Sequence, residues 1–87
     1  MKKYYFTIET NWLGRPKRIA TTFEEAFSHI GEYCEEWTDK GTCRIYKVDE
    51  ELRQVEEWRY WKGKLEEHRI LVDRTWKTLE KNFVRGN

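Results

Sequence analysis

A helix start signal followed by a helical pattern, between residues 22 and 38, constrains the fold of this chain more than any other feature. Residues 22–25, with the sequence TFEE, form a capping box. In it the Thr22 hydroxyl can accept the amide proton of Glu25 while the Glu25 side chain reaches back. Residues 39–41, with the sequence DKG, end the pattern, so the sequence predicts an amphipathic helix over 22–38. Its apolar stripe recurs at helical spacing and comprises Phe23, Ala26, Phe27, Ile30, Cys34 and Trp37.

The segment before this helix predicts a β-hairpin. Residues 3–10 alternate between two faces and are rich in residues that favour strands. Residues 13–14 (Leu-Gly) suit a two-residue turn. Folding the chain there makes two favourable cross-strand pairs, Glu9 with Arg18 and Ile8 with Ile19.

Residues 42–71 favour three further strands. Segments 42–48 and 53–61 are joined at residues 49–52, and Lys62-Gly63 turns the chain into 64–71. The last hairpin would pair opposite charges and apolar residues across the strands: Tyr60 with Leu65, Arg59 with Glu66, Glu56 with Arg69, and Val55 with Ile70.

An alternative for the C-terminal third is a long helix from Lys64 to Phe83. In either case Trp76, Leu79 and Phe83 fall on one stripe of a terminal helix, which Asp73 could cap. The sequence therefore predicts one α+β domain over 1–87 with the order ββαβββα. A small antiparallel sheet packs with one central amphipathic helix and a C-terminal helix.

Composition indicates a folded protein of the cytoplasm. Charged and hydrophobic residues each make up 38% of the 87 residues, but five Trp, five Tyr and four Phe can supply a core. Basic and acidic residues nearly cancel, at 17 and 16, whereas disordered chains carry a large net charge. No secretory signal or membrane-length apolar run is found, and two cysteines in such a chain are most simply reduced thiols.

The chain carries a weak metal pattern and no catalytic one. His29, Cys34, Cys43 and His68 lack the closely spaced ligand pairs of a zinc motif. They are interpreted as core, strand and surface residues, and a small zinc-stabilised domain is the alternative. The carboxylate doublets at 56–57 and 66–67 have arginine partners and no nucleophile, so no enzyme activity and no cofactor are expected.

Charge is segregated along the chain. Residues 1–20 carry five basic and one acidic residue, whereas residues 21–42 carry six acidic and one basic. An ordinary solvated helix face explains the acidic cluster, and an acidic surface that docks on a basic site of another protein is the sharper hypothesis. The acidic face comprises Glu25, Glu32, Glu35, Glu36 and Asp39.

Residues 58–62 (WRYWK) form the second candidate contact. In a strand, Trp58 and Tyr60 face one way while Arg59 and Trp61 face the other. Core packing is the default interpretation, and a protein interface is the second, because Trp, Tyr and Arg dominate interface hot spots. Rings beside basic groups also suit single-stranded nucleic acid, for which the further contacts would be Arg15, Lys17 and Arg18.

The chain resembles the small accessory and anti-defence proteins encoded by phages and prophages of Gram-positive bacteria. The likeness lies in KKYYFTIE at 2–9, TTFEEAF at 21–27, RIYKVDEE at 44–51 and VEEWRYWKGK at 55–64. Such a resemblance implies a protein that binds and blocks host machinery, as anti-CRISPR proteins do, in the cytoplasm of the host cell.

The predicted function is therefore a non-enzymatic protein-binding module, an inhibitor of a bacterial defence or nucleic-acid-processing enzyme. Direct binding of single-stranded nucleic acid is the alternative. The expected partner is another protein, with a second copy of the chain as a further partner and no membrane contact.

Overall fold

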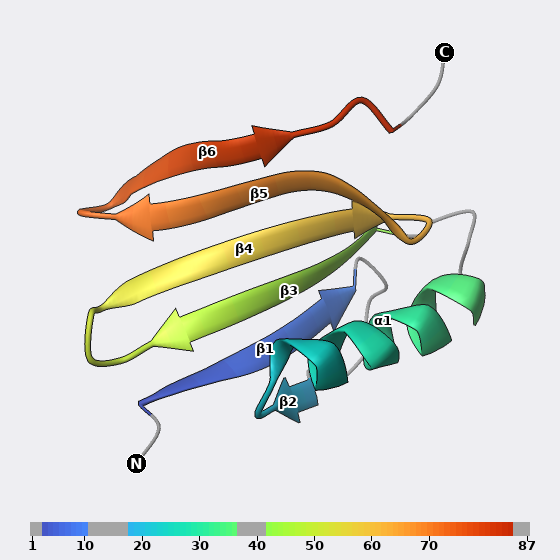
Figure 1. Ribbon diagram of the computed structural model, residues 1–87, viewed down its shortest axis with the longest axis horizontal. Helices are drawn as coiled ribbons and strands as arrows, with labels where there is room; N and C mark the ends of the chain where they lie inside the picture. Colours follow the sequence, from blue (N-terminus) through green and yellow to red (C-terminus); the bar gives the residue numbers. More distant parts are fainter. Residues whose placement is uncertain (1–2, 11–17, 37–41, 85–87) are drawn as a thin grey trace.

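The computed structural model describes residues 3–10, 18–36 and 42–84, with the side chains of Thr10 and of residues 31–36 left aside. Within these ranges the chain forms a single sheet of six strands and one helix (Figure 1). All neighbouring strands are antiparallel, in the order β2-β1-β3-β4-β5-β6. The elements are β1 (Tyr4–Thr10), β2 (Arg18–Ala20), α1 (Phe23–Glu36), β3 (Thr42–Asp49), β4 (Gln54–Trp61), β5 (Lys64–Val72) and β6 (Thr75–Lys81).

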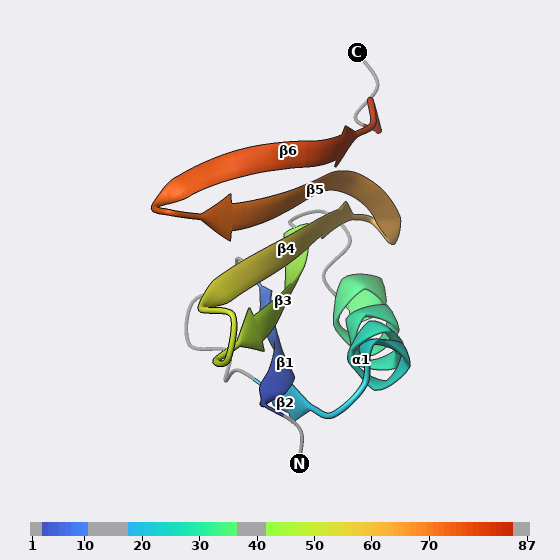
Figure 2. The same ribbon diagram turned by 60° about the vertical axis from the view of Figure 1, so that its left-hand side comes forward.

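The helix α1 covers one face of the sheet, over the half that contains the N-terminal strands. It contacts β1, β2 and β3, and Figure 2 shows β5 and β6 extending beyond it. The buried apolar side chains between helix and sheet form the core, since this is where apolar area is removed from water. They are Phe6, Ile8, Ala20, Ala26, Ile30, Cys43, Ile45 and Tyr60.

The predicted start of α1 is confirmed, with one change of partner. The Glu25 amide donates to Thr22 Oγ1 at 3.1 Å, as the capping box requires. The Glu25 carboxylate reaches back to Thr21, whose amide and hydroxyl donate to it at 3.3 and 3.1 Å. The helix spans Phe23–Glu36, and residues 37–41 of the predicted end lie outside the described residues.

The N-terminal hairpin is confirmed but its predicted register is wrong by one residue. Ile19 lies opposite Thr7, and Arg18 lies opposite Ile8. Ala20 is thereby placed beside Phe6 under the helix, where it is 1% exposed, whereas Ile19 points away and is 71% exposed. Because a slip of one residue exchanges the two faces of a strand, the small buried Ala20 selects the register. The predicted turn at 13–14 lies outside the described residues.

The β4–β5 hairpin is confirmed, and its predicted register is correct only next to the turn. Tyr60 lies opposite Leu65, but a bulge then shifts the pairing, so that Arg59 faces Glu67. The extra residue, Glu66, moves every later pair by one. The actual pairs are Glu56 with Ile70, Val55 with Leu71 and Glu57 with Arg69.

The predicted C-terminal helix is wrong, and so is the alternative of a long helix from Lys64 to Phe83. The structure has β6 instead, which pairs with β5, so the order is ββαββββ and not ββαβββα. Asp73 does not cap a helix: Asp73 and Arg74 form a tight turn with φ values of 52° and 64°. Lys62 and Gly63 form the preceding turn in the same left-handed region, at 50° and 79°. Two positive φ values in succession are typical of the two-residue turns that join antiparallel strands.

Candidate binding surface on the open face of the sheet

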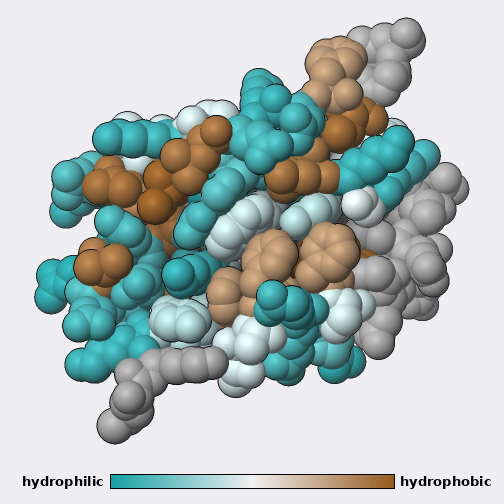
Figure 3. All heavy atoms as spheres, in the orientation of Figure 1, coloured by the Kyte–Doolittle hydropathy of each residue, from teal (hydrophilic) through white to brown (hydrophobic). Residues whose placement is uncertain are grey.

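Figure 3 shows the helix side of the molecule, in the orientation of Figure 1. The opposite face of the sheet, away from α1, presents ordered rows of side chains across the strands. We call this surface the open face. The strand registers define three rows, one apolar, one polar and one ionic. The apolar row is Tyr5, Val48, Val55, Leu71 and Trp76; the polar row is Thr7, Tyr46, Glu57, Arg69 and Thr78; the ionic row is Glu9, Arg44, Arg59, Glu67 and Lys81.

Glu57 is the central residue of the open face and is 2% exposed. Its carboxylate accepts hydrogen bonds from the Tyr46 hydroxyl at 2.9 Å and from Arg69 Nε at 2.8 Å, and Arg44 Nε lies 3.9 Å away. Burial alone would raise the pKa of Glu57, but the hydrogen bonds and the two guanidinium charges lower it below its ordinary value. Glu57 is therefore held as a buried anion that fixes three neighbouring side chains.

The same contacts change the neighbours of Glu57. Burial, followed by the hydrogen bond to Glu57, raises the pKa of Tyr46 to about 12. The hydrogen bond to Glu57 likewise raises the pKa of Arg69. Both groups thus keep their protons, and the Tyr46–Glu57–Arg69 set forms one hydrogen-bonded unit across β3, β4 and β5.

Glu67, 8% exposed, forms the second anionic centre. It accepts hydrogen bonds from Arg59 Nη2 at 2.7 Å and from the Thr78 hydroxyl at 2.9 Å, and so connects β4, β5 and β6. The bulge residue Glu66 lies 3.2 Å from Arg59 Nε, without hydrogen-bond geometry. The bulge therefore gives Arg59 two carboxylates in place of one.

Several cations and rings reach solvent on this face. Arg44, Arg59 and Arg69 keep 28%, 27% and 26% of their side-chain surface exposed, while the two carboxylates below them are buried. Arg69 lies over the Trp76 ring at 4.3 Å, and Lys62 lies over the Trp61 ring at 4.7 Å. Both oxygens of Glu57 and both oxygens of Glu67 already accept a hydrogen bond from a fixed donor.

The structure divides the predicted 58–61 segment between the two faces, as the alternation indicated. Trp58 lies on the helix side of the sheet. Its ring stacks on His68, with ring centroids 4.7 Å apart, and meets the Phe23 ring edge-on at 4.9 Å. Tyr60 is a core residue. Arg59 and Trp61 belong to the open face.

The other predicted contact residues are less well placed. Glu25 is used in the helix start. Arg18 lies exposed on β2, opposite Ile8. The remaining predicted residues lie outside the described side chains, and these are Arg15, Lys17, Glu32, Glu35, Glu36 and Asp39.

The weak metal candidates are not brought together in the described part of the chain. Cys43 is a buried thiol in the core, on β3. His68, on β5, has its Nε2 atom 2.5 Å from the Glu56 carboxylate. His29 lies on α1, and the Cys34 side chain is among those not described. Among the described residues, no three His, Cys, Asp or Glu side chains are grouped to hold a metal ion.

Sequence reasoning missed most of the open face. It did not single out Arg44, Tyr46, Glu57, Arg69 or Trp76 as surface residues of one site. Their signal is the alternation within each strand, which groups them only after the strands are paired in the correct register.

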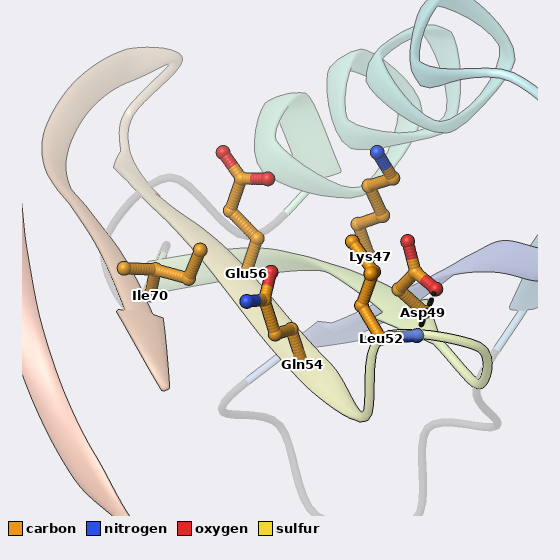
Figure 4. A pocket seen from close by; sticks show the side chains of 6 residues that line it. All are labelled: Lys47, Asp49, Leu52, Gln54, Glu56 and Ile70. Carbon is orange, nitrogen blue, oxygen red and sulfur yellow. Dashed lines mark hydrogen bonds between the residues drawn. The ribbon is translucent and has the colours of Figure 1, made fainter. Parts of the chain in front are cut away.

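A small depression lies on the helix side, at the β3–β4 turn (Figure 4). It has a volume of about 60 Å³, and Asp49 Oδ1 accepts the Leu52 amide beside it at 2.9 Å. Glu56, in its wall, is already bonded to His68. This volume is far below that of ligand pockets, so the depression is not the candidate site. Its lining residues are Lys47, Asp49, Leu52, Gln54, Glu56 and Ile70.

Among the described residues, no helix has the length and apolar character needed to span a bilayer. Comparison with protein-family models, with curated proteins and with solved structures finds no match to this chain.

Proposed function

We propose that this protein is a non-enzymatic binding module that recognises another protein through the open face of its sheet. The observation that carries the proposal is the exposure of Arg44, Arg59 and Arg69 beside aromatic rings, above buried carboxylates. Arginine and tryptophan are the residue types that most often dominate protein interfaces.

The side chains of this surface are preorganised. Glu57 and Glu67 fix Arg69 and Arg59 through hydrogen bonds of 2.8 and 2.7 Å. A fixed guanidinium loses less conformational entropy on binding than a free one, and its remaining N–H groups can still reach a carboxylate. The exposed cations favour a partner surface that carries carboxylates.

A finer proposal concerns the biological role. The resemblance to phage accessory proteins supports an inhibitor that binds a bacterial defence or nucleic-acid-processing enzyme in the host cytoplasm. Within such a partner, the open face would contact an acidic region, and the carboxylates of α1 would contact a basic one.

The test is quantitative affinity capture from bacterial lysate, with and without nuclease, using matched variants. The double variant Arg44→Thr, Trp61→Thr alters the open face, and Leu52→Thr changes a 63%-exposed residue outside that face. We expect a nuclease-resistant partner that wild type and Leu52→Thr retain and the double variant loses. Equal capture by all three proteins would remove the open face from the proposal.

A second candidate function is direct binding of single-stranded nucleic acid. Arg44 and Arg59 are cross-strand neighbours, and the next pair along the strands brings Trp61 beside Lys64. A ring among basic groups can stack on an unpaired base while the cations contact phosphates. Fluorescence anisotropy with a labelled oligonucleotide tests this, and no binding at low salt would end it. If binding occurs, Trp61→Ala should weaken it.

A further inference from the structure

Within the described residues, β6 is an edge strand of the sheet with no partner on its outer side. It is the last strand in the order, and all seven of its residues are exposed. Just beyond the strand, the Asn82 amide donates to the Glu66 carbonyl at 2.9 Å, so the backbone groups of Asn82 point toward β5. Because these directions alternate along a strand, the backbone groups of the preceding residue, Lys81, point away from β5. At the other end, the two-residue turn makes Val72 and Thr75 a hydrogen-bonded pair, so Trp76 and Thr78 also direct their backbone groups outward.

A bulge gives this edge an unusual charge pattern. The register of β6 on β5 shifts by one residue between His68 and Arg69, which leaves Leu79 as the extra residue. Lys77 lies opposite Ile70 and Glu80 lies opposite His68. Opposite residues share a face, so a lysine and a glutamate three positions apart both lie on the helix side.

From this pattern we propose that the β6 edge binds the β6 edge of a second copy of this chain, antiparallel, with Lys77 opposite Glu80. In this register the outward-facing residues meet, because Trp76 of each copy lies opposite Lys81 of the other. Twofold symmetry makes every pair occur twice. The dimer thus gains two Lys77–Glu80 ion pairs and two contacts between Lys81 and the Trp76 ring, which is 38% exposed.

Other registers fit less well. Placing Trp76 opposite Thr78 would bring Lys77 against Lys77 of the second copy, and like charges directly opposite destabilise a strand pair. Placing Lys81 opposite Lys81 has the same fault. Centring the pair on Thr78 would bring outward-facing Trp76 against inward-facing Glu80, because the bulge changes the alternation. Of the registers compared, the one that pairs Lys77 with Glu80 therefore joins outward-facing residues and places opposite charges across the two strands.

The axis of this dimer runs perpendicular to the sheet, so both copies keep their helices on the same side. The two open faces then form one continuous surface, independent of whether that surface binds a protein. Leu79, 56% exposed, lies at the centre of the contact opposite Thr78 of the other copy. One strand pair buries little area, so the dimer should be weak and concentration-dependent.

Sedimentation velocity over a wide range of protein concentration tests this proposal. Wild type should pass from monomer to dimer, and Lys77→Glu or Glu80→Lys should each raise the dimer Kd about tenfold or more. An equimolar mixture of these two variants should form a heterodimer, since both carboxylates of one variant then face the two ammonium groups of the other. The double variant Lys77→Glu, Glu80→Lys should dimerise like wild type.

Thr78→Pro is a second test, because it removes an amide that faces away from β5, and it should abolish dimerisation. It also removes the hydroxyl that donates to Glu67, so circular dichroism is recorded to check that the sheet is retained. A wild type that stays monomeric at every concentration would overturn the proposal and leave the edge open to a strand of another protein. A dimer that tolerates both single charge changes would overturn the register. The charge variants at Lys77 and Glu80 lie on the helix side and do not alter Arg44, Arg59 or Trp61, so failure of the dimer is distinguishable from failure of the proposed function.

Discussion

Arg44 and Arg59 are direct cross-strand neighbours on β3 and β4, with like charges side by side on the open face. Such a pair costs stability. Glu57 near Arg44 and Glu67 at Arg59 offset the cost, with contacts of 3.9 and 2.7 Å. This pair opposes folding, and about a quarter of each side chain stays exposed. It is therefore well suited to bind a carboxylate of a partner protein.

We predict that Arg44→Thr separates stability from binding. Removing one of two opposed charges relieves repulsion, which compensates for the lost contact with Glu57. The free energy of unfolding should change by no more than about 0.5 kcal/mol. Partner capture should fall, and urea unfolding together with the capture assay measures the two effects. A loss of stability as large as the loss of binding would show that Arg44 acts only in the fold.

Arg69→Ala should be severely destabilising, by about 3 kcal/mol, because it leaves the buried Glu57 carboxylate without its strongest partner. Arg69→Lys should give an intermediate loss. Lys64→Ala removes a cation at an exposed position and serves as the control in the same urea titration. If Arg69→Ala and Lys64→Ala unfolded at the same urea concentration, the buried Glu57 carboxylate would not need Arg69 for its stabilisation.

The lowered pKa of Glu57 predicts acid sensitivity. Since the folded pKa lies below the ordinary 4.5, its contribution to stability is present above pH 4.5 and is lost as the pH falls through the folded pKa. Thermal unfolding followed at pH values from neutral to strongly acid measures this loss. Glu57→Gln should be less stable at neutral pH and less sensitive to acid than wild type; parallel curves for the two proteins would contradict the prediction.

Alkaline titration should show a late tyrosine. Tyr46, with a folded pKa of about 12 against an ordinary 10.0, stays protonated while the unfolded chain ionises. Its contribution to stability is complete below pH 10 and is lost as the pH rises through about 12. Absorbance of tyrosinate in the folded protein measures the pKa, and Tyr46→Phe should remove that late step.

The two tight turns predict opposite effects of glycine. Arg74 holds a φ of 64°, which glycine adopts without strain, so Arg74→Gly should stabilise the protein by about 1 kcal/mol. Gly63, at φ 79°, has no atom within 4 Å of an added Cβ, so Gly63→Ala should destabilise by a similar amount through backbone strain alone. Paired urea curves test both changes. Stabilisation by Gly63→Ala would mean that this turn does not hold its positive φ.

Local signals predicted α1 and the strands up to Leu71, because a capping box and alternation depend on neighbouring residues only. The C-terminal segment was predicted wrongly for a physical reason. The bulge at Leu79 adds one residue to β6, so residues three apart, such as Lys77 and Glu80, share a face as they do in a helix. Trp76 and Leu79 have the same spacing of three residues, which matches a helical period although the segment is a strand.

The candidate site was harder to predict than the strands. Arg59 and Trp61 stood out by composition, but Glu57 and Arg69 are joined only by a register that the Glu66 bulge shifts. No local pattern in the sequence marks that bulge. Residue pairs that span three strands depend on every intervening register being right.

The strand order also bears on how the chain reaches its fold. From β3 to β6 each strand pairs with the next one along the chain, across connections of a few residues. Such short-range contacts close with little loss of chain entropy, whereas β1 must find β3 across the whole of β2 and α1. The C-terminal meander can therefore assemble early and serve as the template on which β1, β2 and α1 dock. The helix that the sequence predicts most clearly would then be among the last elements to gain its tertiary contacts.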